Sequence, residues 1–253
     1  MFDLHVGSKP SEAFVQRAES LGYKCIARVH KPSEASGKED AAEDSCPADE
    51  ARLKVLRRVN LGASWEAVPK FRQAYDLVGV EFDGSAPPET FKRLCEKAEC
   101  DIITLDLSKS QLAVHLQPAT VQAALKRGLV FEILYSPVLV SEETRRRNIF
   151  SNAKLLVRST RGRGLVLSSG TGNPLDLRSP LDVANLATLF GLKPAQAKVA
   201  LEGACKDLVE KARAKKVFKR GFHLREKSSE EIAQQREEEE KLRKKKKPKI
   251  LKY

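Results

Sequence analysis

Residues 127–137 read RGLVFEILYSP, and this stretch decides the fold of the chain. From Leu129 to Tyr135, every residue except Glu132 is apolar or aromatic. Turn-forming residues flank the run, with Gly128 before it and Ser136-Pro137 after it. An apolar run without alternation is typical of a strand that is covered on both faces, as in a parallel sheet. The stretch therefore predicts a buried parallel strand in an α/β domain.

Glu132 is the anomaly of this strand, because a buried carboxylate costs free energy unless it is paired. Two interpretations are open from the sequence. In the first, Glu132 pairs inside the protein with an arginine or a backbone donor, and Arg127 is the first partner to test. In the second, Glu132 points into the mouth of a barrel.

Strand-like and helix-like segments alternate along the first 214 residues. Strands are expected at 2–6, 23–30, 51–61 (where a helix also fits), 77–82, 101–107, 129–135 and 164–168, with a further candidate at 112–116. Helices are expected at 8–21, 64–75, 87–98, 118–126, 141–160, 180–190 and 194–214. This order predicts a parallel sheet with outer helices, and so many units in so short a chain favour a TIM-barrel-like α/β barrel over an open sheet. Residues 1–214 are therefore expected to form one barrel.

Two segments fall outside this pattern. Residues 31–50 hold seven acids and two bases, which predicts a mobile acidic loop. Residues 215–253 are expected to form a basic tail that is helical or disordered. From residue 211 onward there are 17 Lys and Arg against 7 acids, which leaves 29 against 27 of the chain totals of 46 and 34. Most of the net charge of +12 therefore lies near the C-terminus.

A basic tail of this kind predicts nucleic-acid binding, nuclear import, or both. The residues that resemble an import signal are Lys244, Lys245, Lys246, Lys247 and Lys249. A second basic cluster falls on the helix expected at 141–160 and on the turn after it. Its members are Arg145, Arg146, Arg147, Lys154, Arg158, Arg161 and Arg163.

Several function classes find no support in the sequence. No apolar run approaches the roughly 18 to 20 residues of a membrane span, and residues 1–5 do not open a secretory signal. The five cysteines lack C-x-x-C spacing, and Cys25, Cys95 and Cys205 sit in apolar segments, so we expect reduced core thiols rather than disulfides or a zinc site. A phosphate-binding P-loop, a G-x-S-x-G elbow and an H-E-x-x-H motif are also missing from the sequence.

The opening residues resemble the first strand of the PHP superfamily, metal-dependent phosphoesterases on a distorted barrel. Their D-x-H-x-H-S motif places two metal-binding histidines on one strand. Residues 3–8 read DLHVGS here, so His5 stands at the first ligand position and Gly7 replaces the second. The family's later S-D-A-H motif is also absent, because residues 168–171 read SSGT. We therefore expect a PHP-type barrel with no metal ion, no cofactor and no catalytic residue.

A more specific resemblance covers residues 1–214 and is densest from 121 to 200. The chain resembles the barrel-shaped, thirty-kilodalton class of protein subunit found in archaeal and eukaryotic ribonuclease P and ribonuclease MRP. The shared blocks, in order, are ALKRGLVFEILYSP at 124–137, the arginines at 145–147, LVLSS at 165–169, LRSPLDVANL at 177–186 and LFGL at 189–192. Residues 31–75 and the tail match weakly.

The resemblance implies a non-catalytic subunit of a ribonucleoprotein endoribonuclease. In this family the RNA component usually frees the 5′ end of tRNA from its precursor, and a role in rRNA processing is also implied. The implied partners are the catalytic RNA of ribonuclease P or MRP, a small α/β protein subunit and other subunits, with precursor tRNA contacted indirectly. The implied location is the nucleus and nucleolus, away from membranes.

Candidate site residues follow from the charge pattern and from the expected barrel. RNA contacts are expected at Arg145, Arg146, Arg147, Arg158, Arg161, Arg163 and Arg178. Contacts at the barrel mouth or with a partner protein are expected at Asp3, His5, Glu132 and Asp182. Arg178 and Asp182 could instead cap a helix and pair with each other. The arginines at 145–147 could equally be a solvated helix face.

Two other functions remain open at this point. One is a PHP-type phosphoesterase with an altered site made of Asp3, His5, Glu132 and His115. The other is a stand-alone RNA-binding module that depends on residues 215–253.

Overall fold

The computed structural model describes residues 1–31, 53–62, 65–72, 74–83, 87–112 and 116–219. The chain divides into two compact units, residues 1–214 and 215–253, and the first contains the sheet. The segments predicted to be an acidic loop and an import signal lie outside the described residues, apart from Lys31.

Seven parallel strands form one sheet in sequence order. They are β1 (Phe2–Val6), β2 (Cys25–His30), β3 (Lys54–Leu61), β4 (Leu77–Phe82), β5 (Ile102–Leu105), β6 (Val130–Leu134) and β7 (Leu165–Ser168). The two edges of the sheet meet where Val6 forms a parallel bridge with Thr171, and the Gly7 N–H donates to the Thr171 carbonyl at 3.2 Å. The sheet is therefore a nearly closed barrel, which confirms the expected architecture.

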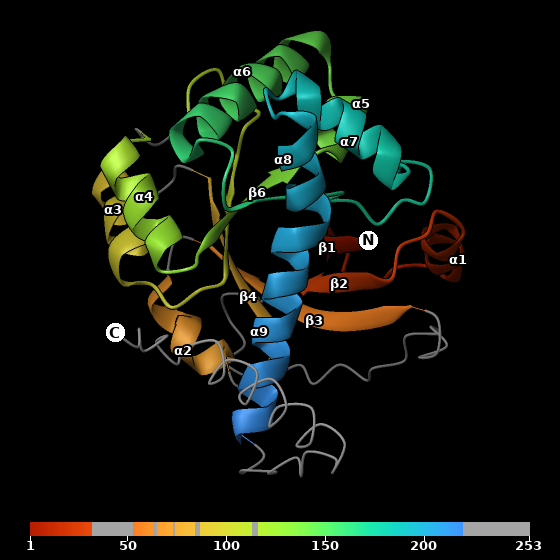
Figure 1. The fold of residues 1–253 in the computed structure, drawn as a ribbon, viewed down its shortest axis with the longest axis horizontal. Coiled ribbons are helices and arrows are strands. Elements are labelled where there is room, and N and C mark those ends of the chain that lie inside the picture. The colour runs from red at the N-terminus through yellow and green to blue at the C-terminus, as the bar shows by residue number, and fades with distance from the viewer. Residues whose placement is uncertain (32–52, 63–64, 73, 84–86, 113–115, 220–253) are drawn as a thin grey trace, which may run out of the picture. The chain divides into compact units, whose positions relative to one another are not determined.

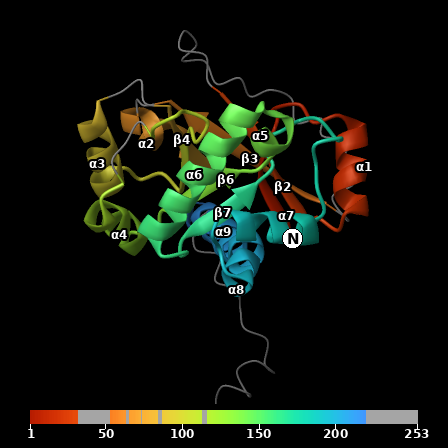
Figure 2. The ribbon, with the colours of Figure 1, turned by 90° about the horizontal axis from the view of Figure 1, so that it is seen from above.

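Helices surround this barrel (Figure 1). They are α1 (Glu12–Ser20), the 3₁₀ turn η1 (Trp65–Ala67), α2 (Val68–Phe71), α3 (Pro88–Lys97), α4 (Pro118–Lys126), α5 (Ser136–Val140), α6 (Glu143–Thr160), α7 (Pro180–Leu189), α8 (Pro194–Lys198), the π-helical turn η2 (Val199–Gly203) and α9 (Ala204–Lys219). Figure 2 shows α3 and α4 on one side of the barrel and α1 on the opposite side. Among the described helices, none combines the length and the apolar character that would be needed to cross a bilayer.

Local sequence explains where these helices begin and end. Ser11 caps α1, and its hydroxyl accepts the Phe14 N–H at 3.2 Å. Gly22 follows α1 with a positive φ of 83°, a conformation that glycine adopts without steric cost. Ser179 caps α7 in the same way by accepting the Asp182 N–H at 3.2 Å.

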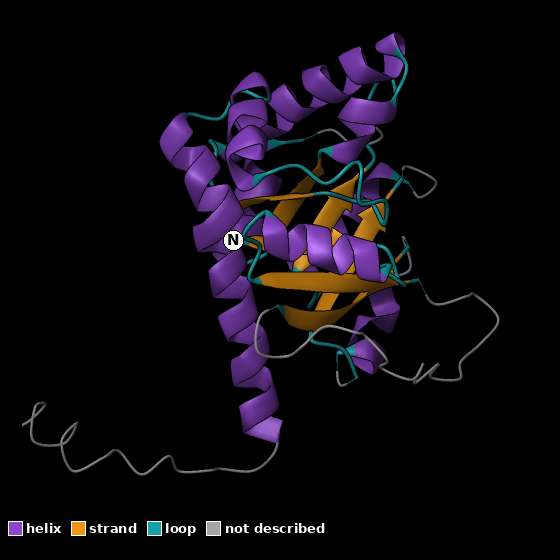
Figure 3. Ribbon diagram, turned by 90° about the vertical axis from the view of Figure 1, so that its right-hand side faces the viewer, coloured by secondary structure: helices purple, strands orange, loops and turns teal. Residues whose placement is uncertain are grey.

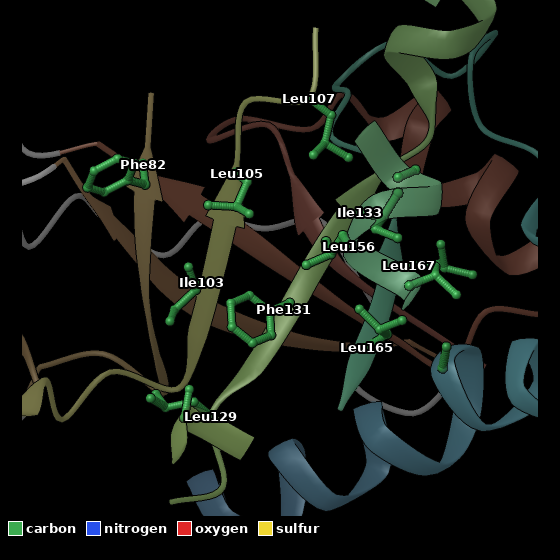
Figure 4. Close-up of a cluster of buried hydrophobic side chains, with 14 of the residues drawn as sticks. Phe82, Ile103, Leu105, Leu107, Leu129, Phe131, Ile133, Leu156, Leu165 and Leu167 are labelled. Carbon is green, nitrogen blue, oxygen red and sulfur yellow. The ribbon is translucent and has the colours of Figure 1, made fainter. Parts of the chain in front are cut away.

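Two apolar layers hold the barrel together. The outer layer lies between strands and helices, and Figure 4 shows Leu156 of α6 facing Phe131, Ile133 and Leu167. The inner layer fills the barrel at the end where the strands begin, and α9 packs into it. Its buried members are Leu4, Cys25, Ala27, Leu56, Leu77, Ile102, Val130, Val166, Cys205, Leu208, Val209 and Ala212. Figure 3 shows the strands surrounded by helices.

The strand predictions are confirmed more closely than the helix predictions. The ambiguous segment 51–61 contains strand β3, and the candidate strand at 112–116 includes residues outside the described part. The helix expected at 141–160 is confirmed as α6, and the short helix α5 before it was not predicted. The single helix expected at 194–214 is interrupted by the π-helical turn η2. The helix expected at 64–75 is shorter than predicted: among its described residues, 65–67 form the 3₁₀ turn η1 and 68–71 form the helix α2.

Candidate functional site

A layer of polar side chains lies inside the barrel next to the inner apolar layer. Side chains on one face of a strand recur every two residues, so the residue two positions after an inward apolar residue also points inward. This parity brings four buried polar side chains into the barrel: Arg58 after Leu56, Thr104 after Ile102, Glu132 after Val130 and Ser168 after Val166. With His5 and Asn60 they form what is called the polar layer below.

Arg58 and Glu132 form a fully buried, two-pronged ion pair at the centre of this layer. Nη1 of Arg58 lies 2.7 Å from Oε1 of Glu132, and Nη2 lies 2.7 Å from Oε2. Both side chains are 0% exposed. The Arg58 Nε–H donates to Oδ1 of Asn60 at 2.7 Å, and Nη1 also donates to the Leu4 carbonyl at 2.7 Å. The guanidinium therefore has the partners that a buried charge requires.

Glu132 accepts three further hydrogen bonds. Its donors are the Thr104 hydroxyl at 2.7 Å, the Ser168 hydroxyl at 2.7 Å and Nδ1 of His5 at 2.8 Å. Burial by itself raises the pKa of the Glu132 carboxyl, but the charge of Arg58 and the contact with His5 outweigh burial and hold this pKa well below its ordinary range. Glu132 is therefore a charged, satisfied residue of the interior.

The structure corrects the sequence interpretation of Glu132 in two respects. Its partner is Arg58 and not Arg127, whose guanidinium donates to the carbonyls of Cys95 at 2.9 Å and Ala98 at 2.6 Å. Glu132 also does not lie at the barrel mouth, because it has no exposed surface. The prediction of an internal ion pair was right in kind and wrong in partner.

Asp3 is equally inaccessible, at 1% exposure, so it does not lie at the barrel mouth within reach of a partner protein. Its Oδ1 accepts the Ser169 N–H at 3.0 Å and the His5 N–H at 3.2 Å. Burial raises the pKa of the Asp3 carboxyl despite these hydrogen bonds, which act in the opposite direction. Asp3 thus fastens β1 to the residue that follows β7.

His5 connects the polar layer to the barrel mouth. An irregular register in β1 between Asp3 and Val6 lets the His5 side chain turn inward. An ionised Glu132 can only accept a hydrogen bond, so Nδ1 of His5 must carry the proton in this contact. The other ring nitrogen of His5, Nε2, lies 3.9 Å from Oε1 of Glu81. Glu81 in turn pairs with Lys31 at 2.9 Å. Burial raises the pKa of Glu81, yet the hydrogen bonds from Lys31 and Asn60 and the charge of Lys31 leave it lowered overall.

A cavity of about 290 Å³ opens at the mouth, beside the carboxyl ends of β4, β5 and β6. Its walls are mixed. Carboxylates of Glu81, Asp83 and Asp106 lie next to apolar side chains, and the lining residues are Glu81, Phe82, Asp83, Thr104, Leu105, Asp106, Leu107, Ser108, Leu134, Pro137 and Ile149. Asp106 is already engaged, because it accepts the N–H of Ser108 at 3.0 Å and its hydroxyl at 2.6 Å.

The residues of the polar layer do not fit a metal ion. The cation at its centre is the Arg58 guanidinium, which occupies both oxygens of Glu132. Among the described residues, no group of three or more His, Cys, Asp or Glu side chains converges on one point. The altered phosphoesterase site does not assemble from Asp3, His5 and Glu132, and His115 lies outside the described residues. No catalytic step through a metal ion follows from this arrangement.

The structure separates the candidate RNA-binding arginines into three places. Arg145, Arg146 and Arg147 lie in the first turns of α6, whereas Arg158, Arg161 and Arg163 lie at its far end, all exposed. An α6 of 18 residues spans about 27 Å. Arg178 is exposed on the loop before α7.

Two of these arginines are tied to neighbouring groups. Arg146 donates to the carbonyls of Val138 at 2.9 Å and Ser141 at 3.0 Å, which fixes α5 against α6. Arg147 forms an ion pair with Glu143 one turn earlier. Asp182 accepts the Ser179 hydroxyl at 2.7 Å at the start of α7, so it stabilises that helix end.

Comparisons with known proteins agree on one family. A family model described as RNase P subunit p30 matches residues 1–217. The probable ribonuclease P protein subunit 3 of Schizosaccharomyces pombe is 32% identical over 202 residues, which cover 77% of this chain and 83% of that protein. The ribonuclease P protein subunit p30 of Mus musculus is 29% identical over 227 residues, covering 81% of this chain and 82% of that protein.

Protein GAMETOPHYTE DEFECTIVE 1 of Arabidopsis thaliana is 40% identical over 146 residues, which cover 58% of this chain but only 24% of that longer protein. Among solved structures, a chain of archaeal ribonuclease P with mature tRNA matches with a TM-score of 0.70 at 15% identity, covering 85% of this chain and 92% of that one. An ochratoxinase of A. niger matches with a TM-score of 0.51 at 9% identity, over 83% of this chain and 71% of that one. At these identities the solved structures support the fold alone.

Proposed function

This chain belongs to the RNase P subunit p30 family, and on that premise we propose that it is a non-catalytic protein subunit of ribonuclease P and of ribonuclease MRP. In this role the chain supports the RNA component, which removes the 5′ leader from precursor tRNA. The chain would support rRNA processing in the same way. The observation that carries the proposal is the family match over residues 1–217, which includes every strand of the barrel.

The chemistry of the barrel interior supports a scaffolding role. In this chain the centre of the barrel is occupied by the Arg58–Glu132 pair, and the pair uses the groups that a catalytic carboxylate would need to keep free. We propose that the barrel, residues 1–214, presents surfaces to RNA and proteins, and that residues 215–253 form a separate basic segment. The proposed partners are the catalytic RNA, a small α/β protein subunit and other subunits of the complex. Precursor tRNA is proposed as an indirect partner.

The surface contacts are proposals of the same kind. Arg145, Arg158, Arg161, Arg163 and Arg178 are exposed cations that suit RNA phosphates. Asp182 is exposed at the start of α7 and suits a protein partner. For location we propose the nucleus and nucleolus, with import directed by the lysines at 244–247 and Lys249, which lie outside the described residues.

Affinity purification tests this function directly. The full chain, tagged and recovered from cell extract, should bring down ribonuclease P RNA and other subunits, with an activity that removes 5′ leaders and is lost on nuclease treatment of the RNA. Recovery of no ribonuclease P or MRP component would overturn the proposal. Stoichiometric zinc or manganese in the pure chain, with a phosphatase activity lost in His5→Ala, would favour the phosphoesterase instead.

A further inference from the structure

Among the stretches of the chain that carry basic residues and no acidic residue, two contain the basic residues of α6 and α8. They are residues 144–175 and 183–201, in a chain that has 34 acids among 253 residues. The first contains all of α6 except Glu143, together with the turn after it, and the second contains most of α7 and all of α8. Together they hold nine basic residues: Arg145, Arg146, Arg147, Lys154, Arg158, Arg161, Arg163, Lys193 and Lys198.

The fold brings these two stretches together. Nε2 of Gln196 in α8 donates to the carbonyl of Arg161 at 3.2 Å, while Oε1 of the same side chain accepts the Lys193 N–H at 3.0 Å. The rings of Phe150 in α6 and Phe190 after α7 lie 5.5 Å apart between centroids. The end of α6 and the start of α8 are therefore neighbours (Figure 1).

Five exposed cations face outward from this junction, and they are called the basic ridge here. Lys154 and Arg158 are four residues apart, which places them on one face of α6, and Arg161 is the residue that caps the end of this helix. Arg163 on the turn and Lys193 at the start of α8 extend the row. Within the described part of the chain, no carboxylate pairs with any of the five. Arg146 and Arg147 are left out of the ridge, because the first donates to backbone carbonyls and the second pairs with Glu143.

We infer that the basic ridge binds the phosphate backbone of RNA without reading its sequence. This inference rests on the proposed function and adds Lys154 and Lys193 to the expected contacts. An unbroken set of cations attracts a polyanion, and arginine matches phosphate with two parallel hydrogen bonds. An acidic protein is a poorer match, because protein interfaces rely on buried aromatic anchors, and the large exposed hydrophobic side chains of the described residues include no aromatic one.

Salt-dependent RNA binding tests the ridge. The full chain and its Lys154→Gln/Arg158→Gln variant are titrated with a transcript of ribonuclease P RNA and with polyuridylate, between about 50 and 200 mM salt. The slope of log affinity against log salt should become shallower by roughly 1.5 in the variant, since each lost phosphate contact removes about 0.7 to 0.9. The affinity of the variant for both RNAs should fall by a similar factor, because phosphate contacts carry no sequence information.

A matched control removes the same charge elsewhere. Lys92→Gln/Arg93→Gln changes two exposed residues of α3, a helix that holds no residue of the ridge, and should leave the slope unchanged. Equal slopes for the ridge variant and this control would overturn the inference, as would competition by polyglutamate as strong as by polyuridylate. If the tagged chain recovered no ribonuclease P RNA from extract, that result would count against the proposed function. The titration with the two RNAs would still show whether the basic ridge binds RNA.

Discussion

The polar layer and the basic ridge both depend on arginine, but they place it in opposite surroundings. Arg58 is 0% exposed and its donors meet Glu132, Asn60 and a backbone carbonyl. Arg158 and Arg161 lie in solvent and meet no carboxylate of the described residues. A buried cation must be satisfied within the chain, whereas an exposed one stays available to a partner. The same residue type therefore holds the fold in one region and is offered for binding in the other.

Removal of the buried cation should have the largest effect on stability. Arg58→Met should lower the free energy of unfolding by about 3–5 kcal/mol, because Glu132 would remain buried and charged without its partner. Urea titration followed by circular dichroism measures the change. The double variant Arg58→Met/Glu132→Leu should recover much of the loss, since replacing both charges by apolar groups is often close to neutral. A single variant as stable as the parent would show that the pair is dispensable.

Acid should weaken the interior without needing a mutation. The pKa of Glu132 is lowered in the folded state, so its stabilisation is present above its unfolded pKa, near 4.5, and is lost as pH falls through the lower folded pKa. The parent should therefore lose stability below about pH 4.5 more steeply than Arg58→Met/Glu132→Leu. Urea midpoints measured at several pH values give the comparison. Parallel pH profiles for the two proteins would contradict the assignment.

Removing one donor to Glu132 should have a smaller effect. Ser168→Ala deletes a hydroxyl that donates to Oε1 at 2.7 Å, and a hydrogen bond to a charged group contributes about 1.5–3 kcal/mol. The exposed Ser151→Ala in α6 is a matched control for the same chemical change and should alter stability little. If Ser168→Ala and Ser151→Ala lowered the thermal unfolding temperature equally, the hydrogen bond from Ser168 to Glu132 would not contribute to stability as expected.

The smallest stability effect is expected on the ridge. Lys154→Gln/Arg158→Gln should change the free energy of unfolding by less than about 0.5 kcal/mol, because exposed side chains away from caps and ion pairs contribute little. Its effect should be confined to RNA binding. A large loss of stability in this variant would mean that the ridge belongs to the scaffold and would erase the contrast with Arg58.

Much of the fold was predictable because strands and helices alternate clearly in the sequence. The pairing of Glu132 was not predictable with the same ease, because Arg58 is 74 residues away and stands in the strand sequence LKVLRRVNL beside Arg57. Parity was the available signal: Arg58 lies two positions after Leu56 and so shares its inward face. Sequence neighbourhood pointed to Arg127 instead, which is fixed by carbonyls of the α3 end.

The surface was harder to predict than the interior. The basic cluster at 145–163 was visible in the sequence as a run of positive charges. Which of its cations bind neighbouring groups and which belong to the basic ridge depends on contacts that the sequence did not reveal. The hydrogen bonds from Arg146 to Val138 and Ser141 require the short helix α5, which the sequence interpretation did not predict. The approach of Lys193 to the turn at Arg161 depends on Gln196, and no spacing rule links residues 35 positions apart.

The seam that closes the barrel also sets an order of events during synthesis. The Asp3–Ser169 bond and the Val6–Thr171 bridge join the first strand to residues made more than 160 positions later. At roughly 5–20 residues per second, a ribosome needs on the order of ten to thirty seconds to supply that second edge. Until then β1 lacks its pairing with this second edge, and the α9 side chains that fill the inner layer have not been made. An unpaired strand edge can join other chains, so the nascent barrel is most exposed to aggregation in the interval before residues 165–212 emerge.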